Sequence, residues 1–316
     1  MIALLTACVP TGKLVPATVD EDPTLPAMPL HVAGHDRLVH LETFGDPSDP
    51  VILMLHGSLA DHRAFLPYEV LSERYFVVMW DQRGSGLSER VTADEYTWDG
   101  IVEEIDAIKA VFSPERPVTL IGHSFGAMFS ALYISSRPHD VRQAVLLEPA
   151  ALTGDGFAAT AADITNIDLL ATGLNEGFWQ SEALSASQHE LADYKALRLL
   201  LDGHQTNYHC DPDHPTDLPL WRAGAHVEYR RAQNMGLEGG GANLRADFDF
   251  AFGLQDFSEP VLLVASECSA LGTDMQQRYN VPLFANVELV TLPGTGHRMF
   301  VEDVDGTLAV IEAYLE

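Results

Sequence analysis

The sequence predicts an α/β fold in which a doubly wound, mostly parallel sheet carries an inserted helical cap. Two observations indicate the sheet. Short apolar runs recur without polar alternation, as strands covered on both faces require, and each is followed by a turn and a longer helical pattern. The third observation indicates the cap: residues 151–258 contain no such run and are too long for an ordinary loop.

The expected strands are continuous apolar runs that end at turn residues. They cover residues 51–55, 76–80, 118–121, 145–147 and 261–264, and a further apolar strand is expected at residues 287–292. Residues 37–44 are different, because polar and apolar side chains partly alternate there. That pattern predicts an antiparallel strand at the edge of the sheet.

Two helices are expected between these strands. Residues 99–112 place apolar side chains at spacings of three and four, with Asp99 as a cap and Pro114 as a stop. Residues 125–137 form a second helical pattern that ends before Pro138.

The chain is long enough for a large core, with 316 residues of which 47% are hydrophobic. We assign the sheet and its helices to residues 31–150 and 259–316, and the helical cap to residues 151–258. Within the cap, helical patterns cover residues 191–201 and 221–235.

The charge balance excludes some classes of partner. Lys and Arg number 18 against 46 Asp and Glu, which gives a net charge of −28. A surface this acidic repels nucleic acid and anionic lipid. No apolar run reaches the roughly 18–20 residues of a spanning helix, so an integral membrane protein is not expected.

The amino-terminal sequence predicts a targeting signal. The first residues are apolar, and LTAC at residues 5–8 resembles the lipobox at which bacterial lipoproteins are lipidated on cysteine. We expect residues 1–30 to be a lipoprotein signal and proline-rich tether, with lipid on Cys8 holding an exported domain at a membrane. The alternative is a cytoplasmic protein, because the apolar stretch is short and no Lys or Arg precedes it. In an exported domain, Cys210 and Cys268 could pair.

The pentapeptide GHSFG at residues 122–126 matches G-x-S-x-G between a strand and a helix. The chain must turn sharply between this strand and this helix, and the turn needs small residues on either side of the serine, which Gly122 and Gly126 provide. It exposes the Ser124 hydroxyl at a helix N-terminus, where the dipole favours developing negative charge. Ser124 is therefore the expected nucleophile.

A serine nucleophile needs a base and oxyanion donors. His297 is the expected base, because it follows the last strand and lies C-terminal to the serine. The Phe125 N–H group, next after the nucleophile, is one expected donor. The second is expected from the turn after the first parallel strand, at the N–H group of Ser58 or Leu59.

Four motifs, in their order and at their strand ends, resemble the α/β-hydrolase superfamily. They are HGS at 56–58, DQRGSG at 81–86, GHSFG at 122–126 and GTGH at 294–297. The DQRGSG loop, structural in that family, is especially similar to the proline iminopeptidase branch. The resemblance implies a serine hydrolase that cleaves a small carboxylic ester or amide through an acyl-enzyme, without a cofactor. Serine at position 124 argues against the dehalogenase and epoxide hydrolase branches, which use a carboxylate nucleophile.

The carboxylate that orients the histidine base, the third member of the catalytic triad, departs from the commonest pattern of this family. In most relatives it follows the strand at 261–264, and that place falls on Ser269, which carries no charge. Some branches keep the acid at the end of the preceding strand. Glu148 stands there, so we expect a Ser-His-Glu triad, with Glu267 and Asp274 as reserve acids.

No metal site is expected from the sequence. One group of candidate ligands lies in the expected cap, but its spacing matches no structural zinc pattern, and it is interpreted as a loop at the substrate entrance. Its members are His204, His209, Cys210, Asp211, Asp213 and His214.

Two other functions remain open. A proline iminopeptidase-like aminopeptidase would need cap carboxylates to hold the substrate ammonium, and Glu176, Glu182 and Glu228 are candidates. A non-catalytic binding protein with this fold is the alternative of a different class, because Ser269 cannot serve as the acid; a surface-tethered scaffold is a weaker form of it.

Overall fold

The computed structural model describes residues 16–58, 60–164, 208–210 and 248–316. Several residues singled out from the sequence lie outside these ranges. They are Cys8, Leu59, the cap carboxylates Glu176, Glu182 and Glu228, and His204, Asp211, Asp213 and His214. No helix among the described residues has both the length and the apolar character needed to cross a bilayer.

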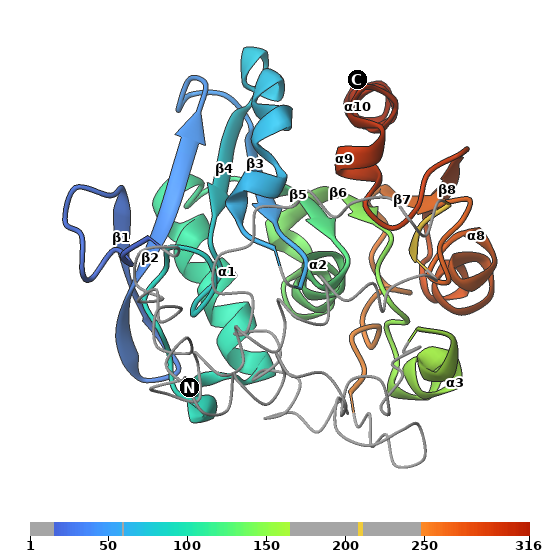
Figure 1. Ribbon diagram of the computed structural model, residues 1–316, viewed down its shortest axis with the longest axis horizontal. Coiled ribbons are helices and arrows are strands. Elements are labelled where there is room, and N and C mark those ends of the chain that lie inside the picture. Colours follow the sequence, from blue (N-terminus) through green and yellow to red (C-terminus); the bar gives the residue numbers. More distant parts are fainter. Residues whose placement is uncertain (1–15, 59, 165–207, 211–247) are drawn as a thin grey trace, which may run out of the picture.

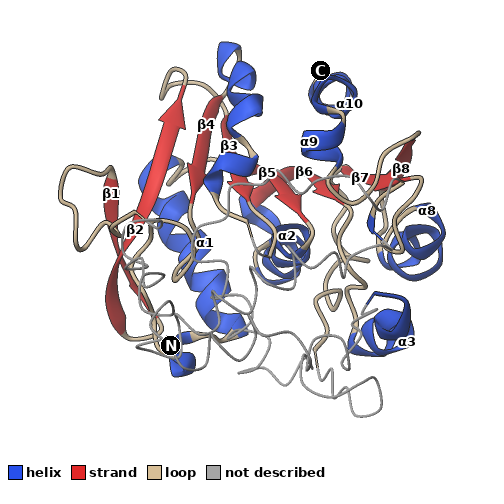
Figure 2. Cartoon of the chain, in the orientation of Figure 1, coloured by secondary structure: helices blue, strands red, loops and turns tan. Residues whose placement is uncertain are grey.

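An eight-stranded sheet forms the centre of the molecule, in the order β1-β2-β4-β3-β5-β6-β7-β8 (Figures 1 and 2). β1 pairs with β2 and β2 with β4 in antiparallel fashion, and all the other pairs are parallel. The strands are β1 Ala27–Val32, β2 His35–Phe44, β3 Val51–Leu55, β4 Phe76–Trp80, β5 Val118–His123, β6 Val141–Leu147, β7 Val261–Ser266 and β8 Val287–Leu292.

Helices cover both faces of this sheet (Figure 2). The α-helices are α1 Trp98–Phe112, α2 Phe125–Ser136, α3 Gly154–Ile164, α8 Thr273–Met275, α9 Met299–Glu302 and α10 Val304–Leu315. Shorter 3₁₀ helices lie at His62–Ala64, Leu66–Glu73, Ala93–Glu95, Pro138–Asp140 and Val281–Leu283, and a π-helical turn lies at Gln276–Asn280. This layering confirms the α/β class and its doubly wound sheet.

The central apolar runs form strands that are buried on both faces, as in β3, β4 and β5. In β3, Val51, Leu53 and Leu55 belong to the core cluster that includes α1 and α2 residues. Ile52 and Met54 point to the opposite face, where the core includes residues of the Leu66–Glu73 helix, α9 and α10. A side-chain period of two therefore sends alternate residues into two separate hydrophobic layers.

The amino-terminal side of the sheet differs from the prediction. β2 is antiparallel, as expected, but it is not the edge strand, because β1 pairs along its outer side. Residues 27–30, expected to belong to a solvated tether, form part of β1, and Met28 and Leu30 are buried. The alternation of buried and exposed residues in β1 is the strand signal that the neighbouring prolines obscured.

The cap of α1 also differs from the prediction. Thr97 is the N-cap residue, and its hydroxyl accepts a hydrogen bond from the Gly100 N–H at 3.0 Å. Asp99 instead lies in the first turn, where its charge is favourable to the helix dipole.

An ion pair joins β2 to the short helix Ala93–Glu95. Arg37 Nη2 lies 2.7 Å from Glu95 Oε1, and the Glu95 side chain is fully buried. Burial disfavours the Glu95 charge, but the hydrogen bonds from Arg37 and Thr92 outweigh it and lower the Glu95 pKa to about 2.

Both ends of the expected cap segment pack on the core. α3 begins at Gly154, and Phe248 and Phe250 are buried in the same cluster as α2. The Ser135 hydroxyl in α2 donates a hydrogen bond to the Phe250 carbonyl at 2.7 Å. The chain thus leaves and rejoins the sheet against the helical face that α2 covers.

Candidate active site

The turn between β5 and α2 holds Ser124 in a strained conformation. Its φ of 53° and ψ of −116° lie outside the region that ordinary residues favour. The Ser124 N–H donates to the Leu147 carbonyl at 2.9 Å, which ties the turn to the end of β6. The strain is therefore maintained by the sheet itself, as expected for a serine displayed at a strand end.

The two glycines of the pentapeptide allow this turn to pack closely. A Cβ at Gly122 would overlap the Gly126 carbonyl, and a Cβ at Gly126 would overlap the Leu55 carbonyl at the end of β3. Any side chain at either position would push Ser124 away from the sheet.

Glu148 contacts the imidazole of His297. Glu148 Oε2 lies 2.5 Å from His297 Nδ1, and the Glu148 side chain is fully buried. Because an ionised carboxylate only accepts hydrogen bonds, Nδ1 carries the proton and Nε2 keeps its lone pair. This is the tautomer that a general base requires.

Backbone geometry and a second hydrogen-bonded pair fix the position of Glu148. It follows β6 directly with a left-handed φ of 45°, and its N–H donates to the Val264 carbonyl of β7 at 2.8 Å. Its other oxygen, Oε1, accepts from the Ser266 N–H at 2.9 Å and from the Ser266 hydroxyl at 2.5 Å. These contacts compensate the cost of burying the carboxylate and leave Oε2 for His297.

His123 is a site residue that sequence reasoning missed. Its Nε2–H donates to the His297 carbonyl at 2.8 Å, and the two rings lie 4.6 Å apart. Burial, reinforced by the nearby His297, holds the His123 pKa well below its ordinary value, so the ring is neutral. The variable position of G-x-S-x-G carries no sequence signal for this contact.

Residues 208–210, a short described stretch within the expected cap segment, lie against the loop that carries His297. The His297 N–H donates to the Tyr208 carbonyl at 2.7 Å, and the Tyr208 ring lies 5.0 Å from the imidazole. Cys210 forms a disulfide with Cys268, with Cα atoms 4.9 Å apart. Residues far apart in the sequence are thus joined at the candidate base.

His209 and Cys210, two members of the predicted loop cluster, have other partners. His209 Nδ1 lies 2.8 Å from Glu302 Oε1, while Cys210 is in the disulfide. Burial disfavours the Glu302 charge, yet the hydrogen bonds from His209 and the Gly296 N–H lower the Glu302 pKa. Both residues therefore stabilise the His297 loop.

The expected oxyanion turn packs on the nucleophile turn. A Cβ at Gly57 would lie 3.0 Å from Ser124 Cβ and 2.7 Å from His123 Nδ1, so only glycine fits there without displacement. Ser58 follows Gly57 directly, and Phe125 is the first residue of α2. The two expected donors therefore lie on segments that flank Ser124.

In the part of the chain that the structure describes, neither reserve acid is hydrogen-bonded to the His297 ring. Glu267 is exposed and accepts from the Gly294 N–H at 2.7 Å, and Asp274 is exposed in α8. Among the hydrogen bonds of the described residues, none joins Ser124 Oγ to the His297 ring. Catalytic hydrogen bonds of this type often tighten only when substrate binds.

Comparisons with known proteins identify the family. The family model described as alpha/beta hydrolase fold matches residues 50–304. A 2-(acetamidomethylene)succinate hydrolase of Mesorhizobium japonicum is 26% identical over 281 residues, which cover 85% of this chain and 89% of that protein.

Two solved structures share the fold. The proline iminopeptidase of Mycobacterium smegmatis has a TM-score of 0.62 and 20% identity, with 92% of this chain and 97% of that chain covered. The esterase RhEst1 from Rhodococcus sp. ECU1013 has a TM-score of 0.64 and 15% identity, with 92% of this chain and 98% of that chain covered. The chain belongs to the alpha/beta hydrolase fold family and is a hydrolase of that type.

Proposed function

We propose that this enzyme is a serine hydrolase that cleaves a small carboxylic ester or amide through an acyl-enzyme, with Ser124, His297 and Glu148 as its triad. The observation that carries the proposal is the hydrogen bond between Glu148 Oε2 and His297 Nδ1. The Glu148 carboxylate that contacts His297 is buried. The His297 carbonyl in turn accepts a hydrogen bond from His123, the residue before Ser124.

The first half of the reaction forms the acyl-enzyme. Ser124 Oγ attacks the substrate carbonyl carbon while His297 Nε2 takes the hydroxyl proton. The carbonyl oxygen becomes an oxyanion, for which the N–H groups of Ser58 and Phe125 are the proposed donors. The imidazolium then gives its proton to the leaving alcohol or amine as the bond to the carbonyl carbon breaks.

Water completes the cycle. His297 Nε2 removes a proton from water, the hydroxide oxygen attacks the acyl carbon, and the same proton returns to Ser124 Oγ as the acid leaves. Throughout, Glu148 remains ionised and stabilises the imidazolium. His123, held neutral by burial, adds no competing positive charge beside His297.

The substrate class follows from the family and its relatives. The Mesorhizobium relative is named for an acetamido-bearing succinate, which supports testing amides as well as esters on this chain. The alternative is an aminopeptidase of the proline iminopeptidase type, which the DQRGSG loop at 81–86 favours.

A non-catalytic protein is disfavoured by the contact at His297. That alternative arose because Ser269 stands at the usual acid position. Ser269 Oγ accepts a hydrogen bond from the Leu271 N–H at 3.0 Å, while the imidazole has Glu148 as its carboxylate partner.

The test combines covalent labelling with a substrate panel. A fluorophosphonate probe should label the wild-type enzyme and should not label Ser124→Ala, which must retain its thermal unfolding midpoint. Hydrolysis of p-nitrophenyl esters and an N-acetyl amide, measured beside proline-p-nitroanilide, separates the proposed function from the aminopeptidase. Folded wild-type enzyme that neither reacts with the probe nor cleaves any of these substrates would refute the proposal.

We also propose that the enzyme is exported and held at a membrane by lipid on Cys8. The Cys210–Cys268 disulfide supports an oxidising compartment, because cytoplasmic thiols are kept reduced. Cell fractionation of wild type and Cys8→Ser tests this location. Recovery of wild-type enzyme with reduced thiols in the cytoplasm would contradict it.

A further inference from the structure

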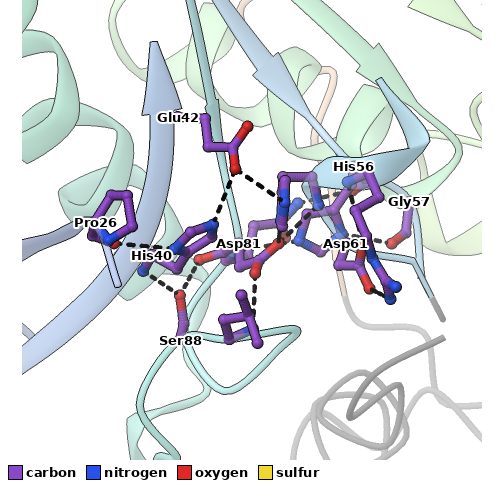
Figure 3. Close-up of polar contacts among 12 residues, drawn as sticks. Pro26, His40, Glu42, His56, Gly57, Asp61, Asp81 and Ser88 are labelled. Carbon is purple, nitrogen blue, oxygen red and sulfur yellow. Dashed lines mark hydrogen bonds and ion pairs between the residues drawn. The ribbon is translucent and has the colours of Figure 1, made fainter. Parts of the chain in front are cut away.

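Two histidines and a glutamate converge beside Asp81, the first residue of the DQRGSG loop. His40 and Glu42 are two residues apart on β2, so their side chains share one face of the strand. His62 lies in the short helix after the oxyanion turn. Glu42 Oε1 lies 3.8 Å from both His40 Nε2 and His62 Nε2. Figure 3 shows the dashed line that joins Glu42 to the His40 ring.

Both imidazoles are oriented with their Nε2 atoms toward this point. His40 Nδ1 lies 2.9 Å from the Pro26 carbonyl oxygen, which can only accept, so Nδ1 carries the proton (Figure 3). His62 Nδ1 lies 2.8 Å from Asp81 Oδ1 in the same way. In their neutral forms, each ring then presents an Nε2 lone pair to Glu42. Histidines that bind metals are oriented by such carbonyl and carboxylate partners.

One of these nitrogen atoms has no hydrogen-bond partner among the residues that the structure describes. It is His40 Nε2, which is buried, and the His40 side chain is only 2% exposed. A buried acceptor without a donor is costly, and an ion at this point would satisfy it. The Glu42 side chain is 35% exposed, which provides a route from solvent.

The spacing fits an ion better than a hydrogen bond. A distance of 3.8 Å exceeds the range of about 2.7–3.2 Å for N–H···O hydrogen bonds. Two ligand atoms that each lie about 2.1 Å from a tetrahedral zinc ion are roughly 3.4 Å apart, so each distance from Glu42 to an imidazole needs to close by a few tenths of an ångström. The three ligand atoms all lie within 4.8 Å of one another.

We propose that His40, Glu42 and His62 form a binding site for a divalent transition-metal ion of the Zn²⁺ type, with water in the fourth position. Two neutral imidazoles and one carboxylate are ligands that zinc prefers. The ion would join β2 to the segment that follows the oxyanion turn. It would therefore stabilise the fold beside the active site without taking part in the hydrolysis.

Protonation of His62 would compete with metal binding by this residue. Burial opposes the positive charge on His62. The hydrogen bond that its Nδ1–H donates to Asp81, together with the Asp81 charge, outweighs burial and raises the His62 pKa. A protonated His62 leaves His40 Nε2 unpaired, whereas a metal ion satisfies both rings. Measurements at pH 8 favour the metal over the proton because ligands must be deprotonated.

Zinc binding to the full-length protein is measured by isothermal titration after removal of bound metal with EDTA. We expect one Zn²⁺ per chain and a higher thermal unfolding midpoint in its presence. Glu42→Gln should weaken binding at least about 100-fold, since outer-shell changes alone cost 10- to 100-fold. His31→Gln is the matched control, because His31 also contacts a carboxylate, Asp36, but on the exposed surface. It should bind zinc as the wild type does.

Co²⁺ substitution distinguishes this site from adventitious binding. The wild-type enzyme should show the visible absorption of four-coordinate Co²⁺, and Glu42→Gln should lose it. Zinc that binds Glu42→Gln and wild type equally, or folded wild type that binds no zinc, would overturn the proposal. Labelling of Ser124 by the fluorophosphonate probe is independent of either result, so this site and the hydrolase function are tested separately.

Discussion

The replacement Glu148→Gln isolates the charge that His297 contacts. The Ser266 N–H is a fixed donor to Oε1, so the amide oxygen of glutamine takes that position. The amide NH₂ then faces His297 Nδ1, which must give up its proton to accept this hydrogen bond. The proton moves to Nε2, and the imidazole can no longer accept the Ser124 proton.

The expected loss follows from this change of tautomer. Replacing the acid of a serine-protease triad by its amide lowers kcat by about 10⁴, which corresponds to roughly 5 kcal/mol of transition-state stabilisation. We expect a loss of about 10³–10⁴ in kcat for a p-nitrophenyl ester, with little change in KM. The fold should be retained, because both Ser266 contacts persist.

Glu267→Gln is the matched control. Glu267 is an exposed carboxylate near the same loop, where it accepts from the Gly294 N–H and does not contact His297. Its replacement should leave kcat within about threefold of wild type, as surface substitutions usually do. If Glu148→Gln stayed within tenfold of wild type while Glu267→Gln lost activity, the assignment of the acid would be wrong.

Three further changes test other parts of the site. Gly57→Ala places a Cβ 3.0 Å from Ser124 Cβ and should lower kcat about 10²-fold without changing the substrate preference. Cys210→Ser opens a disulfide that spans 58 residues and should cost about 2–4 kcal/mol in urea unfolding; an unchanged midpoint would show that the link is not stabilising. The Glu95 pKa falls from 4.5 to about 2 on folding, so its contribution of roughly 3 kcal/mol is present above pH 4.5 and is lost as the pH falls toward 2. Glu95→Gln should flatten this acid-side loss in urea unfolding between pH 5 and pH 2.5, whereas the exposed Glu73→Gln should follow wild type.

The parallel strands were the most predictable part of the fold. β3, β4 and β8 begin and end at the residues expected from their apolar runs, because flanking turn residues mark both ends. β1 was missed because prolines at positions 26 and 29 make its sequence resemble a tether. An outer strand can accept a proline that a central strand cannot.

The candidate site was predictable where a residue lies at a strand end. The contact between Glu148 and His297 is the one expected from the departure at Ser269, although its catalytic role stays a prediction. His123 could not be found in this way, since its partner is a backbone carbonyl that only the folded chain brings near. The proximity of His40 and His62 could not be predicted for the same reason. The two residues lie on separate elements, β2 and the short helix His62–Ala64, and only the folded chain brings their rings within 4.6 Å.

Trapping the acyl-enzyme shows directly whether Ser124 is the nucleophile. Enzyme mixed with a p-nitrophenyl ester is quenched in acid within the first turnovers, and its peptides are analysed by mass spectrometry. We expect the acyl group on the peptide that contains Ser124, and we expect Glu148→Gln to acquire it far more slowly. Turnover by Ser124→Ala at the wild-type rate, or an acyl group carried by another residue, would contradict this expectation.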